Sequence, residues 1–470
     1  MKKKEFRKNA KDTLNWMVKY FDDLNEYPVK SKVKPREIFD KLSNQAPKKG
    51  EKFSDILNDF QKIIIPGMTH WQHPNFYAFF PANNSYPSIL AEMITATMGA
   101  QCMMWETSPA AAELEEKVLE WLKIELGLPK NWSGVINDTA SSGTLASLLT
   151  AREVKSDFSI NKKGITKNNF TIYASIEAHS SIEKSIKIIG IGKNNLRKIK
   201  VDKNLSMNTK ELELEIKKDI KSNNTPLAII STFGTTGTVA LDPINEIALI
   251  AKKYKIWHHI DAAYAGSALL INKYQKHINN IYLADSFLFN PHKWMLTNFD
   301  CSIYYVKNKR NLIKTFEIFP EYLKTKSKKV NNYKDWGIQL GRRFRSLKLW
   351  FVIKSYGING IKKIIKKHIK LAKSLNKIIL NEIDFEITAK QKFNMINFRY
   401  RPSKINKKHS LNRINKMLLE KLNKSGKIYL SHTKINDIYS IRMPIGNTLV
   451  EEKDIVSSWK LITKTARSIK

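Results

Sequence analysis

The chain has 470 residues, of which 42% are hydrophobic and ten are tryptophan, and its formal net charge is +38. This composition predicts a globular protein of two or three domains, and no apolar run approaches the roughly 18 residues that a membrane-spanning helix needs. The basic excess is spread along the chain, mostly as lysine, without zinc-finger spacing or a basic tail with stacking aromatics, so we expect no specific nucleic-acid partner and no membrane partner.

The first 65 residues predict helices separated by polar turns. Phe53, Ile56, Leu57 and Phe60, for example, recur at the spacing of one helix face. Little in these helices suggests chemistry, and we expect them to pack against a partner subunit.

Residues 71–88, WQHPNFYAFFPANNSYPS, are rich in aromatic side chains and include three prolines. Proline interrupts helices and central strands, so this stretch predicts an irregular loop. The loop either fills the core or forms the wall of a pocket for a flat substrate. Helices are then expected over 84–99 and 108–126.

From 133 to about 310, short apolar strands alternate with helices, which is typical of a layered α/β domain. The first strand, 134–136, leads into the hydroxyl-rich stretch 138–144, and a helix is expected over 145–152. Backbone N–H groups at such a strand-to-helix turn suit a phosphate. The alternative is an ordinary Ser/Thr helix cap.

Further polar residues follow the next strands of this pattern. His179 comes after the strand at 171–174, a hydroxyl-rich loop at 234–238 follows the strand at 227–231, and Asp261 ends the strand at 257–260. The carboxyl ends of strands are where α/β sheets place ligands. A carboxylate there can pair with a cationic ring nitrogen; the alternative is an Asp that caps the next helix.

The stretch around Lys293 is the centre of the pattern. An apolar strand at 287–289 is broken by Asn290 and Pro291, and His292, Lys293 and Trp294 follow at once. Burial lowers the pKa of a lysine, and a neutral amine is what Schiff-base chemistry needs. The alternative is a lysine whose ammonium reaches water. Taken together, a lysine, an acid, a histidine and a phosphate turn at successive strand ends describe a pyridoxal phosphate site.

The part of the chain that follows the α/β pattern predicts a surface loop and a second, smaller domain. Residues 319–335 are polar and rich in lysine, which predicts a mobile surface loop. After about residue 349, lysine-rich helices over 361–380, short strands at 385–387, 395–398 and 439–442, and a last helix over 450–468 predict a small α+β domain.

Cysteine usage predicts the compartment. Cys102 and Cys301 are the only cysteines, which provides neither a disulfide framework nor a zinc pattern. The basic start of the chain is not followed by the apolar segment of a signal peptide. We therefore expect a cytoplasmic protein without a metal site.

The chain resembles the aromatic-L-amino-acid decarboxylase family of the group II pyridoxal phosphate-dependent decarboxylases, from about Phe6 to the last helix. The matching motifs are HPNFYAFFPANNSYPSIL, SPAAAELEEKVLEWL, AHSSIEK, DAAYAGSA, DSFLFNPHKWMLTNFDCS and GRRFRSLKLWF. The resemblance implies the α/β fold of type I pyridoxal phosphate enzymes, with a mostly parallel sheet, and a homodimer with active sites at the subunit interface. We expect an N-terminal helical segment (1–84) on the partner subunit, a cofactor-binding α/β domain (85–348) and a C-terminal α+β domain (349–470).

The resemblance also implies residue roles. Lys293 forms the Schiff base with pyridoxal 5'-phosphate, Asp261 pairs with the ring nitrogen, and His179 stacks on one face of the ring. The other implied cofactor residues, which flank the ring or hold or neighbour the phosphate, are Ala140, Ser141, Thr236, Ala263, Asn290 and His292.

The implied reaction is decarboxylation of an aromatic L-amino acid to an arylalkylamine and CO2. In the family a loop tyrosine protonates Cα, and the matching residue is Tyr322; members with phenylalanine there tend to make aldehydes oxidatively. Tyrosine therefore favours the amine, with aldehyde synthesis as one alternative and a catalytically idle, polyanion-binding protein as another.

The substrate pocket is expected to hold an aromatic ring. Relatives with serine at the position of Gly341 include histidine- and tyrosine-selective enzymes, and a glycine leaves room for a larger ring, including an indole. Ala82 stands where the animal aromatic decarboxylases often have threonine. The predicted substrate residues are Trp71, Phe79, Phe80, Pro81, Ala82 and Gly341.

Overall fold

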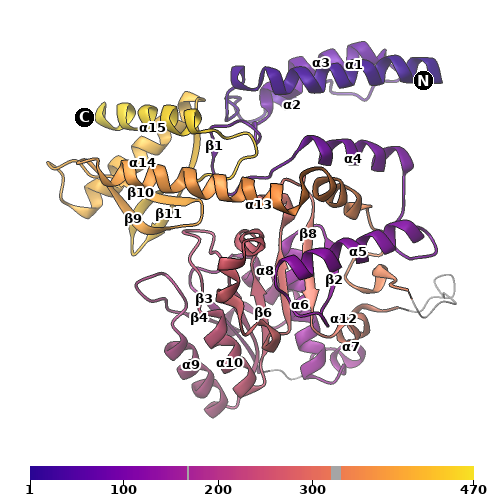
Figure 1. Ribbon diagram of the computed structural model, residues 1–470, viewed down its shortest axis with the longest axis vertical. Coiled ribbons are helices and arrows are strands. Elements are labelled where there is room, and N and C mark those ends of the chain that lie inside the picture. Colours follow the sequence, from indigo (N-terminus) through magenta and orange to yellow (C-terminus); the bar gives the residue numbers. More distant parts are fainter. Residues whose placement is uncertain (167–168, 319–329, 470) are drawn as a thin grey trace. The chain divides into compact units, whose positions relative to one another are not determined.

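The structure is a computed structural model that describes residues 1–166, 169–318 and 330–469 (Figure 1). The chain divides into two compact units. Unit 1 comprises Met1–Pro81, Lys373–Thr388 and Asn397–Lys470, and unit 2 comprises Ala82–Ala372 and Ala389–Ile396. Within the described ranges, every helix is too short or too polar to cross a bilayer.

Unit 2 is built on a seven-stranded sheet in the order β2-β8-β7-β6-β5-β3-β4. Strand β8 runs antiparallel to both of its neighbours, and all other neighbouring strands are parallel. The predicted mostly parallel α/β sheet is therefore confirmed, and the carboxyl ends of six strands share one edge. The strands are β2 (Ser133–Asn137), β3 (Phe170–Ser175), β4 (Leu196–Ile199), β5 (Thr225–Thr232), β6 (Trp257–Asp261), β7 (Ser286–Phe289) and β8 (Ser302–Val306).

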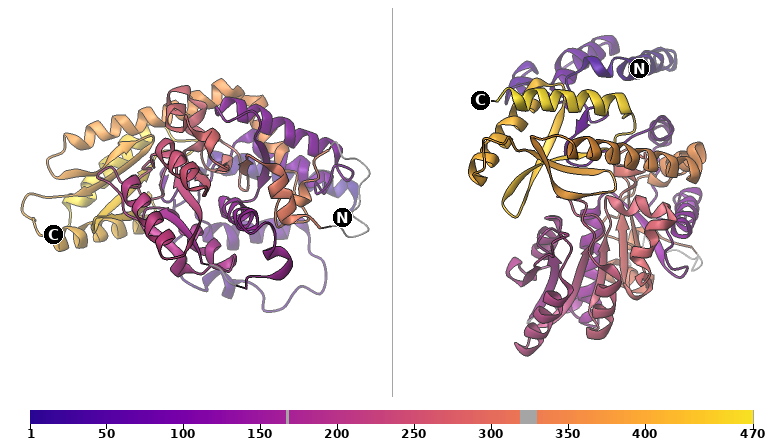
Figure 2. Two further views of the ribbon diagram at one scale, coloured as in Figure 1. Left: turned by 90° about the horizontal axis from the view of Figure 1, so that it is seen from below. Right: turned by 60° about the vertical axis from the view of Figure 1, so that its left-hand side comes forward.

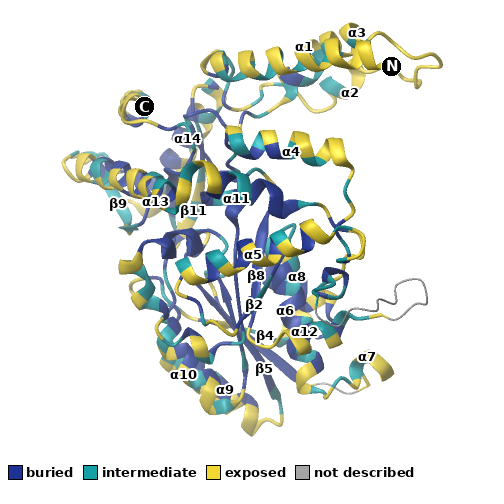
Figure 3. Ribbon diagram, turned by 45° about the vertical axis from the view of Figure 1, so that its right-hand side comes forward, coloured by how far each residue is buried: buried dark blue, intermediate teal, exposed yellow. Residues whose placement is uncertain are grey.

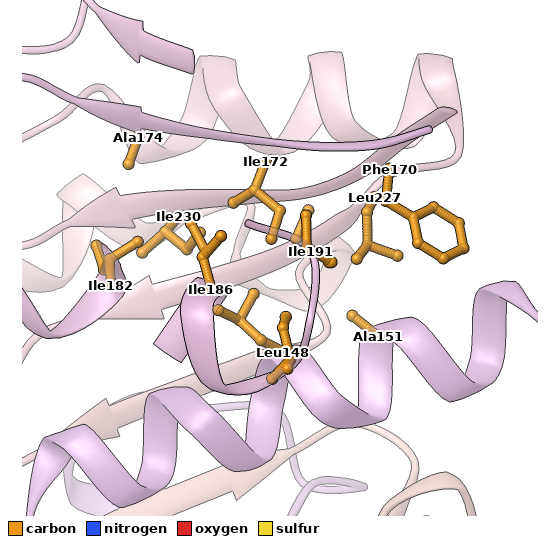
Figure 4. Close-up of a cluster of buried hydrophobic side chains, with 12 residues drawn as sticks. Leu148, Ala151, Phe170, Ile172, Ala174, Ile182, Ile186, Ile191, Leu227 and Ile230 are labelled. Carbon is orange, nitrogen blue, oxygen red and sulfur yellow. The ribbon is translucent and has the colours of Figure 1, made fainter. Parts of the chain in front are cut away.

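Helices cover both faces of this sheet, because its central strands are apolar on both sides (Figures 2 and 3). On one face, Ile172 and Ile230 pack against α6 (Ala140–Lys155) and α8 (Ser181–Ile188) (Figure 4). On the other face, the next residues along the same strands, Tyr173 and Ile229, contact a second group of helices. These are α9 (Thr209–Lys221) and α10 (Ile244–Tyr254).

The remaining helices of unit 2 include two that were predicted closely. α4 (Tyr86–Met98) ends at Gly99, whose φ of 58° is a left-handed cap that favours glycine, and α5 (Pro109–Glu125) begins with proline, where the missing N–H costs nothing. The others are α7 (Ile160–Lys163), α11 (Pro291–Trp294), α12 (Lys309–Phe316) and the first part of α13 (Arg345–Leu380), together with 3₁₀ turns at Lys193–Asn195, Ala265–Leu270, Asn272–Ile278, Ile281–Leu283 and Tyr333–Asp335.

Unit 1 joins the two ends of the chain in one five-stranded sheet, ordered β1-β11-β12-β10-β9. The two-residue strand β1 (Phe76–Tyr77), from the aromatic loop, pairs in parallel with β11 (Tyr429–Ile435) at the sheet edge. The loop is thus too broken for a central strand, as predicted. The other elements are α1 (Lys3–Asp22), α2 (Glu37–Lys41), α3 (Phe53–Asp59), a π turn at Phe60–Ile64, 3₁₀ turns at Leu24–Glu26 and Ile65–Gly67, β9 (Phe385–Lys392), β10 (Met395–Tyr400), α14 (Lys408–Ser425), β12 (Ile438–Pro444) and α15 (Glu452–Arg467). The parts of β9 and β10 within residues 389–396 belong to unit 2.

Candidate active site

The carboxyl edge of the seven-stranded sheet collects the predicted cofactor residues. Each of them ends or follows a strand that terminates at this edge, and all belong to unit 2. By strand they are Ala140 and Ser141 after β2, His179 after β3, Thr236 after β5, Asp261 and Ala263 at β6, and Asn290, His292 and Lys293 after β7.

Asp261 is the last residue of β6 and is buried. It pairs with Thr232 of β5 on one side and Leu288 of β7 on the other, so its backbone is fixed between two neighbouring strands. Its Oδ1 accepts a 3.0 Å hydrogen bond from the N–H of Ala263, which orients the carboxylate. The result is a fixed negative charge in the middle of the edge.

Lys293 lies on the single turn α11, directly after β7. Its N–H donates to the carbonyl of Asn290 (3.0 Å), and its own carbonyl accepts from the side-chain amide of Asn83 (2.7 Å). Burial lowers the pKa of the Lys293 amine, and the charge of Asp261 opposes this shift. The neutral amine is thereby favoured at a strand end, as the sequence predicted.

His179 follows β3 and interacts electrostatically with both Asp261 and Lys293. Its Nδ1 accepts the N–H of Ser181 at 3.1 Å and lies 2.8 Å from the Ser181 hydroxyl. Because a backbone N–H can only donate, the proton of the neutral ring is on Nε2. Burial lowers the pKa of His179, Asp261 opposes that shift, and Lys293 adds to it, so the ring is neutral at pH 7.

His292 is buried beside Lys293. Its Nδ1 accepts the N–H of Cys301 at 2.9 Å, and its ring lies 4.8 Å from the ring of Phe299. Burial lowers the pKa of His292 to about 3, with the Lys293 charge acting in the same direction. His292 is therefore a neutral ring that is held by the segment leading into β8.

The predicted phosphate turn is the first turn of α6. The helix begins at Ala140, whereas a helix was expected only from Leu145; this boundary was wrong because hydroxyl residues favour turns when they are considered in isolation. Thr139, in an extended conformation, is the N-cap, and within the described contacts its side chain makes no capping bond to the backbone. The N–H groups of Ala140, Ser141 and Ser142 therefore have no intrahelical acceptor and suit an anion.

The predicted substrate residues divide between the two units. Trp71, Phe79, Phe80 and Pro81 belong to unit 1, where the rings of Trp71 and Phe79 stack at 6.0 Å, whereas Ala82 and Gly341 belong to unit 2. A Cβ at Gly341 would lie 3.2 Å from Nε2 of Gln101. Tyr322 lies outside the described residues.

Two residues that hold the lysine turn were missed from the sequence. Asn83 donates its N–H to the carbonyl of His292 (3.0 Å) as well as its side chain to Lys293. Ser302 donates its hydroxyl to Oδ1 of Asn290 (2.7 Å). A polar residue directly after the apolar run of residues 79–82 was a usable signal for Asn83. Ser302 carried no such signal, because a serine at a strand start is common.

An aromatic stack supports the same turn. Trp294 lies parallel to Tyr264, with ring centroids 5.2 Å apart and planes at 7°, and its Nε1 donates to Nδ1 of His368 (3.0 Å). All three side chains are buried. The residue after Lys293 is thus anchored between the loop that follows β6 and helix α13.

Histidines 258 and 259 face opposite sides of β6. His258 bonds to the hydroxyl of Ser231 at 2.7 Å, while His259 bonds to Ser286 at 2.8 Å. This is the alternation expected of neighbouring strand residues. Both rings belong to the buried sheet.

The residues at this edge fit pyridoxal 5'-phosphate chemically. A lysine with a lowered pKa can attack a carbonyl carbon, a buried carboxylate can hold the proton of a pyridine nitrogen, and a free helix N-terminus can bind a phosphate.

Comparison with known proteins agrees with this chemistry. The sequence model of the pyridoxal-dependent decarboxylase conserved domain matches residues 35–401. The chain is 38% identical to a tyrosine decarboxylase of Papaver somniferum (99% of this chain, 95% of the relative) and 37% identical to a phenylacetaldehyde synthase of a Rosa hybrid cultivar (99% and 94%). It is also similar to the crystal structure of Catharanthus roseus tryptophan decarboxylase in complex with L-tryptophan, with a TM-score of 0.93, 35% identity and 99% of each chain covered.

Proposed function

The chain belongs to the pyridoxal-dependent decarboxylase family, and we propose that its reaction converts an aromatic L-amino acid to the corresponding arylalkylamine and CO2. The enzyme is a carboxy-lyase whose cofactor is pyridoxal 5'-phosphate. When bound, this cofactor accepts the electrons of the bond that is broken as CO2 leaves. The observation that carries the proposal is the placement of Lys293, Asp261 and the α6 N-terminus at one sheet edge, in a chain whose relatives include tyrosine and tryptophan decarboxylases.

Lys293, Asp261 and His179 have different proposed roles at this edge. Lys293 attaches through its neutral amine, which burial favours. Asp261 holds a proton on the ring nitrogen, because its carboxylate is buried and fixed at the end of β6. His179, a neutral imidazole with its proton on Nε2, would hold one face of the cofactor ring, and Ala263 would hold the other face.

The phosphate end of the cofactor is assigned to the first turn of α6. The N–H groups of Ala140 and Ser141 point out of the helix end, where the helix dipole favours negative charge. Asn290 contributes its side-chain amide, and His292 on α11 and Thr236 on the loop after β5 lie at the same edge.

Tyr322 is proposed as the acid that protonates Cα after CO2 has left. This assignment rests on the family resemblance of the FPEYLK stretch. The competing outcome is an aldehyde, formed with consumption of O2 and water and with release of CO2, ammonia and hydrogen peroxide. It has specific support, because a relative at 37% identity is a phenylacetaldehyde synthase. Because this chain has tyrosine at position 322, we favour the amine as the product.

Recognition of the substrate ring is proposed for an aromatic loop and two small residues. Trp71 and Phe79 are exposed, with Phe79 50% exposed, Phe80 is half-buried, and Pro81 is buried. Ala82 and Gly341 leave space for a larger ring. An aromatic substrate, including an indole, follows from these side chains and from the names of the relatives.

A homodimer with active sites at its interface is proposed as the working form, with the N-terminal segment 1–84 on the partner subunit. The support is an exposed apolar stripe on α4, formed by Tyr86, Leu90, Ile94 and Met98 at four-residue spacing. Analytical ultracentrifugation of the cofactor-loaded protein tests this: a monomer at micromolar concentration would contradict it.

A cytoplasmic location is also proposed. Both cysteines, Cys102 and Cys301, are buried as free thiols, and neither needs an oxidising compartment. Fractionation of cells that express the full chain tests the location.

The experiment that tests the reaction is product analysis. Purified, cofactor-loaded protein is incubated with tryptophan, tyrosine, DOPA, phenylalanine and histidine. CO2 with an equivalent amount of amine establishes the proposal and ranks the substrates. Aldehyde with ammonia and peroxide would favour the competing outcome, and absence of turnover with all five would reject the substrate class.

A further inference from the structure

Ser302 occupies a central place below the cofactor edge. It is the first residue of β8, the strand that separates β2 from β7, and it is fully buried. Its backbone pairs with Asn137 of β2, two residues before the N-cap of α6. Its hydroxyl donates a 2.7 Å hydrogen bond to Oδ1 of Asn290, directly after β7. One residue therefore contacts both strands that lead to the proposed phosphate site.

We propose that Ser302 is a positioning residue that selects the phosphate form of the cofactor by orienting the amide of Asn290. The inference rests on the proposed function of Asn290. An amide has an acceptor end and a donor end, and only the donor end, Nδ2, attracts a phosphate. By binding Oδ1, the Ser302 hydroxyl keeps the acceptor end of Asn290 turned toward the sheet.

Without this hydroxyl, the two orientations of the amide become closer in free energy. The orientation with Oδ1 toward the ligand places an oxygen lone pair against a negatively charged phosphate, which weakens binding. Burial raises the free-energy cost of losing this hydrogen bond, since a buried amide oxygen without a donor is left unpaired. The effect is specific to a ligand that carries the phosphate, because the aldehyde end binds at Lys293.

The test compares two probes on the full-length protein. Dissociation constants of pyridoxal 5'-phosphate and of pyridoxal, which lacks the phosphate, are measured from the visible absorption of the bound ligand. In Ser302→Ala, the constant for pyridoxal 5'-phosphate is expected to rise about tenfold while that for pyridoxal is unchanged. When Ser302→Ala is added to Asn290→Ala, the double variant is expected to have the same ratio of the two dissociation constants as Asn290→Ala alone.

Ser286→Ala is the matched control. Ser286 is another fully buried serine, at the opposite end of β7, and its hydroxyl bonds to Ser147 and His259. Loss of the Ser286 hydroxyl is expected to lower the urea midpoint of the apo protein but not to change the ratio of the two dissociation constants. Equal weakening of both probes by Ser302→Ala, or no weakening of either, would overturn the role of Ser302. An unaltered protein that does not discriminate between the probes would overturn the phosphate site itself and this inference with it.

Discussion

The carboxylate of Asp261 raises the pKa of the Lys293 amine, while burial of the lysine lowers that pKa by a larger amount. Asp261 ends β6, and Lys293 lies on the single turn α11 that follows the neighbouring parallel strand β7, so the sheet brings both residues to one edge. The buried amine therefore has a lowered pKa even beside the carboxylate of Asp261. The first two predictions concern this pair.

Asp261→Asn is expected to lower kcat by roughly 100-fold or more, because a preorganised charge at the reacting system is lost. Steady-state rates of CO2 release measure the effect. Asp285→Asn is the control: Asp285, a half-buried carboxyl just before β7, accepts the N–H of His258 at the opposite edge of the sheet. Comparable rate losses in the two variants would remove the special role of Asp261.

Lys293→Ala is expected to abolish covalent capture of the cofactor and to reduce turnover on the order of 10³-fold or more. Borohydride reduction of the cofactor-loaded protein, followed by peptide mapping, locates the attached lysine. Label at the peptide that contains Lys293 in the unaltered protein, and none in the variant, is the expected result. Label on another lysine would contradict the assignment.

Tyr322→Phe is expected to divert the reaction, with the aldehyde becoming the major product and peroxide and ammonia accompanying it. The physical reason is the loss of the hydroxyl that supplies the proton to Cα. The ratio of amine to aldehyde, measured by mass spectrometry, is the readout. Tyr282→Phe, which removes a hydroxyl from a ring that is 55% exposed, is the control and should leave the ratio unchanged.

Acid is expected to destabilise the fold below about pH 6.5. Burial lowers the pKa values of His258, His259 and His292 to about 3 each. Between pH 6.5 and 3 the unfolded chain binds more protons than the folded one, so the free energy of unfolding falls as the pH falls, by up to about 1.4 kcal/mol per pH unit for each ring.

Urea unfolding at pH 7, 6 and 5 measures this loss. In His258→Asn, the side chain still offers a polar group to Ser231 but no longer titrates. The difference in urea midpoint between the unaltered protein and this variant should therefore shift in favour of the variant as the pH falls. A difference in urea midpoint that does not change with pH would show that His258 is protonated to the same extent in the folded and the unfolded chain.

The ion pair between Arg342 and Glu115 is expected to matter for stability. Its N–O distance is 2.7 Å, and both side chains are at most 5% exposed. Arg342→Met leaves the Glu115 charge buried without its partner, which should cost about 3–5 kcal/mol. Lys41→Met, which breaks the exposed 3.0 Å pair with Glu37, should cost much less, because water screens that pair. Urea midpoints of the two variants compare them.

The strand ends of unit 2 were predictable because their signals are local. A short apolar run that stops at Asn290 and Pro291, or at Asp261, predicts both the strand and the residue at which the strand ends. β8 was missed, since an antiparallel strand inserted between two parallel ones depends on pairing partners far away in the sequence. Gly357, with a φ of 62°, divides α13 into two helical parts, and the second part matches the helix expected from Ile361. The first part, from Arg345, was missed, because its turns are stabilised by burial of Leu349 and Val352.

By itself, the sequence determined the class of fold and the cofactor, and it predicted the residues that are proposed to carry the chemistry, because apolar periodicity and strand-end residues are properties of short segments. The tertiary structure alone decided how those residues are held. The proton on Nε2 of His179, the anchoring of Lys293 by Asn83 and the contact of Ser302 with Asn290 each need a partner from another segment of the chain. Such contacts depend on distances of about 3 Å between atoms that only folding brings together.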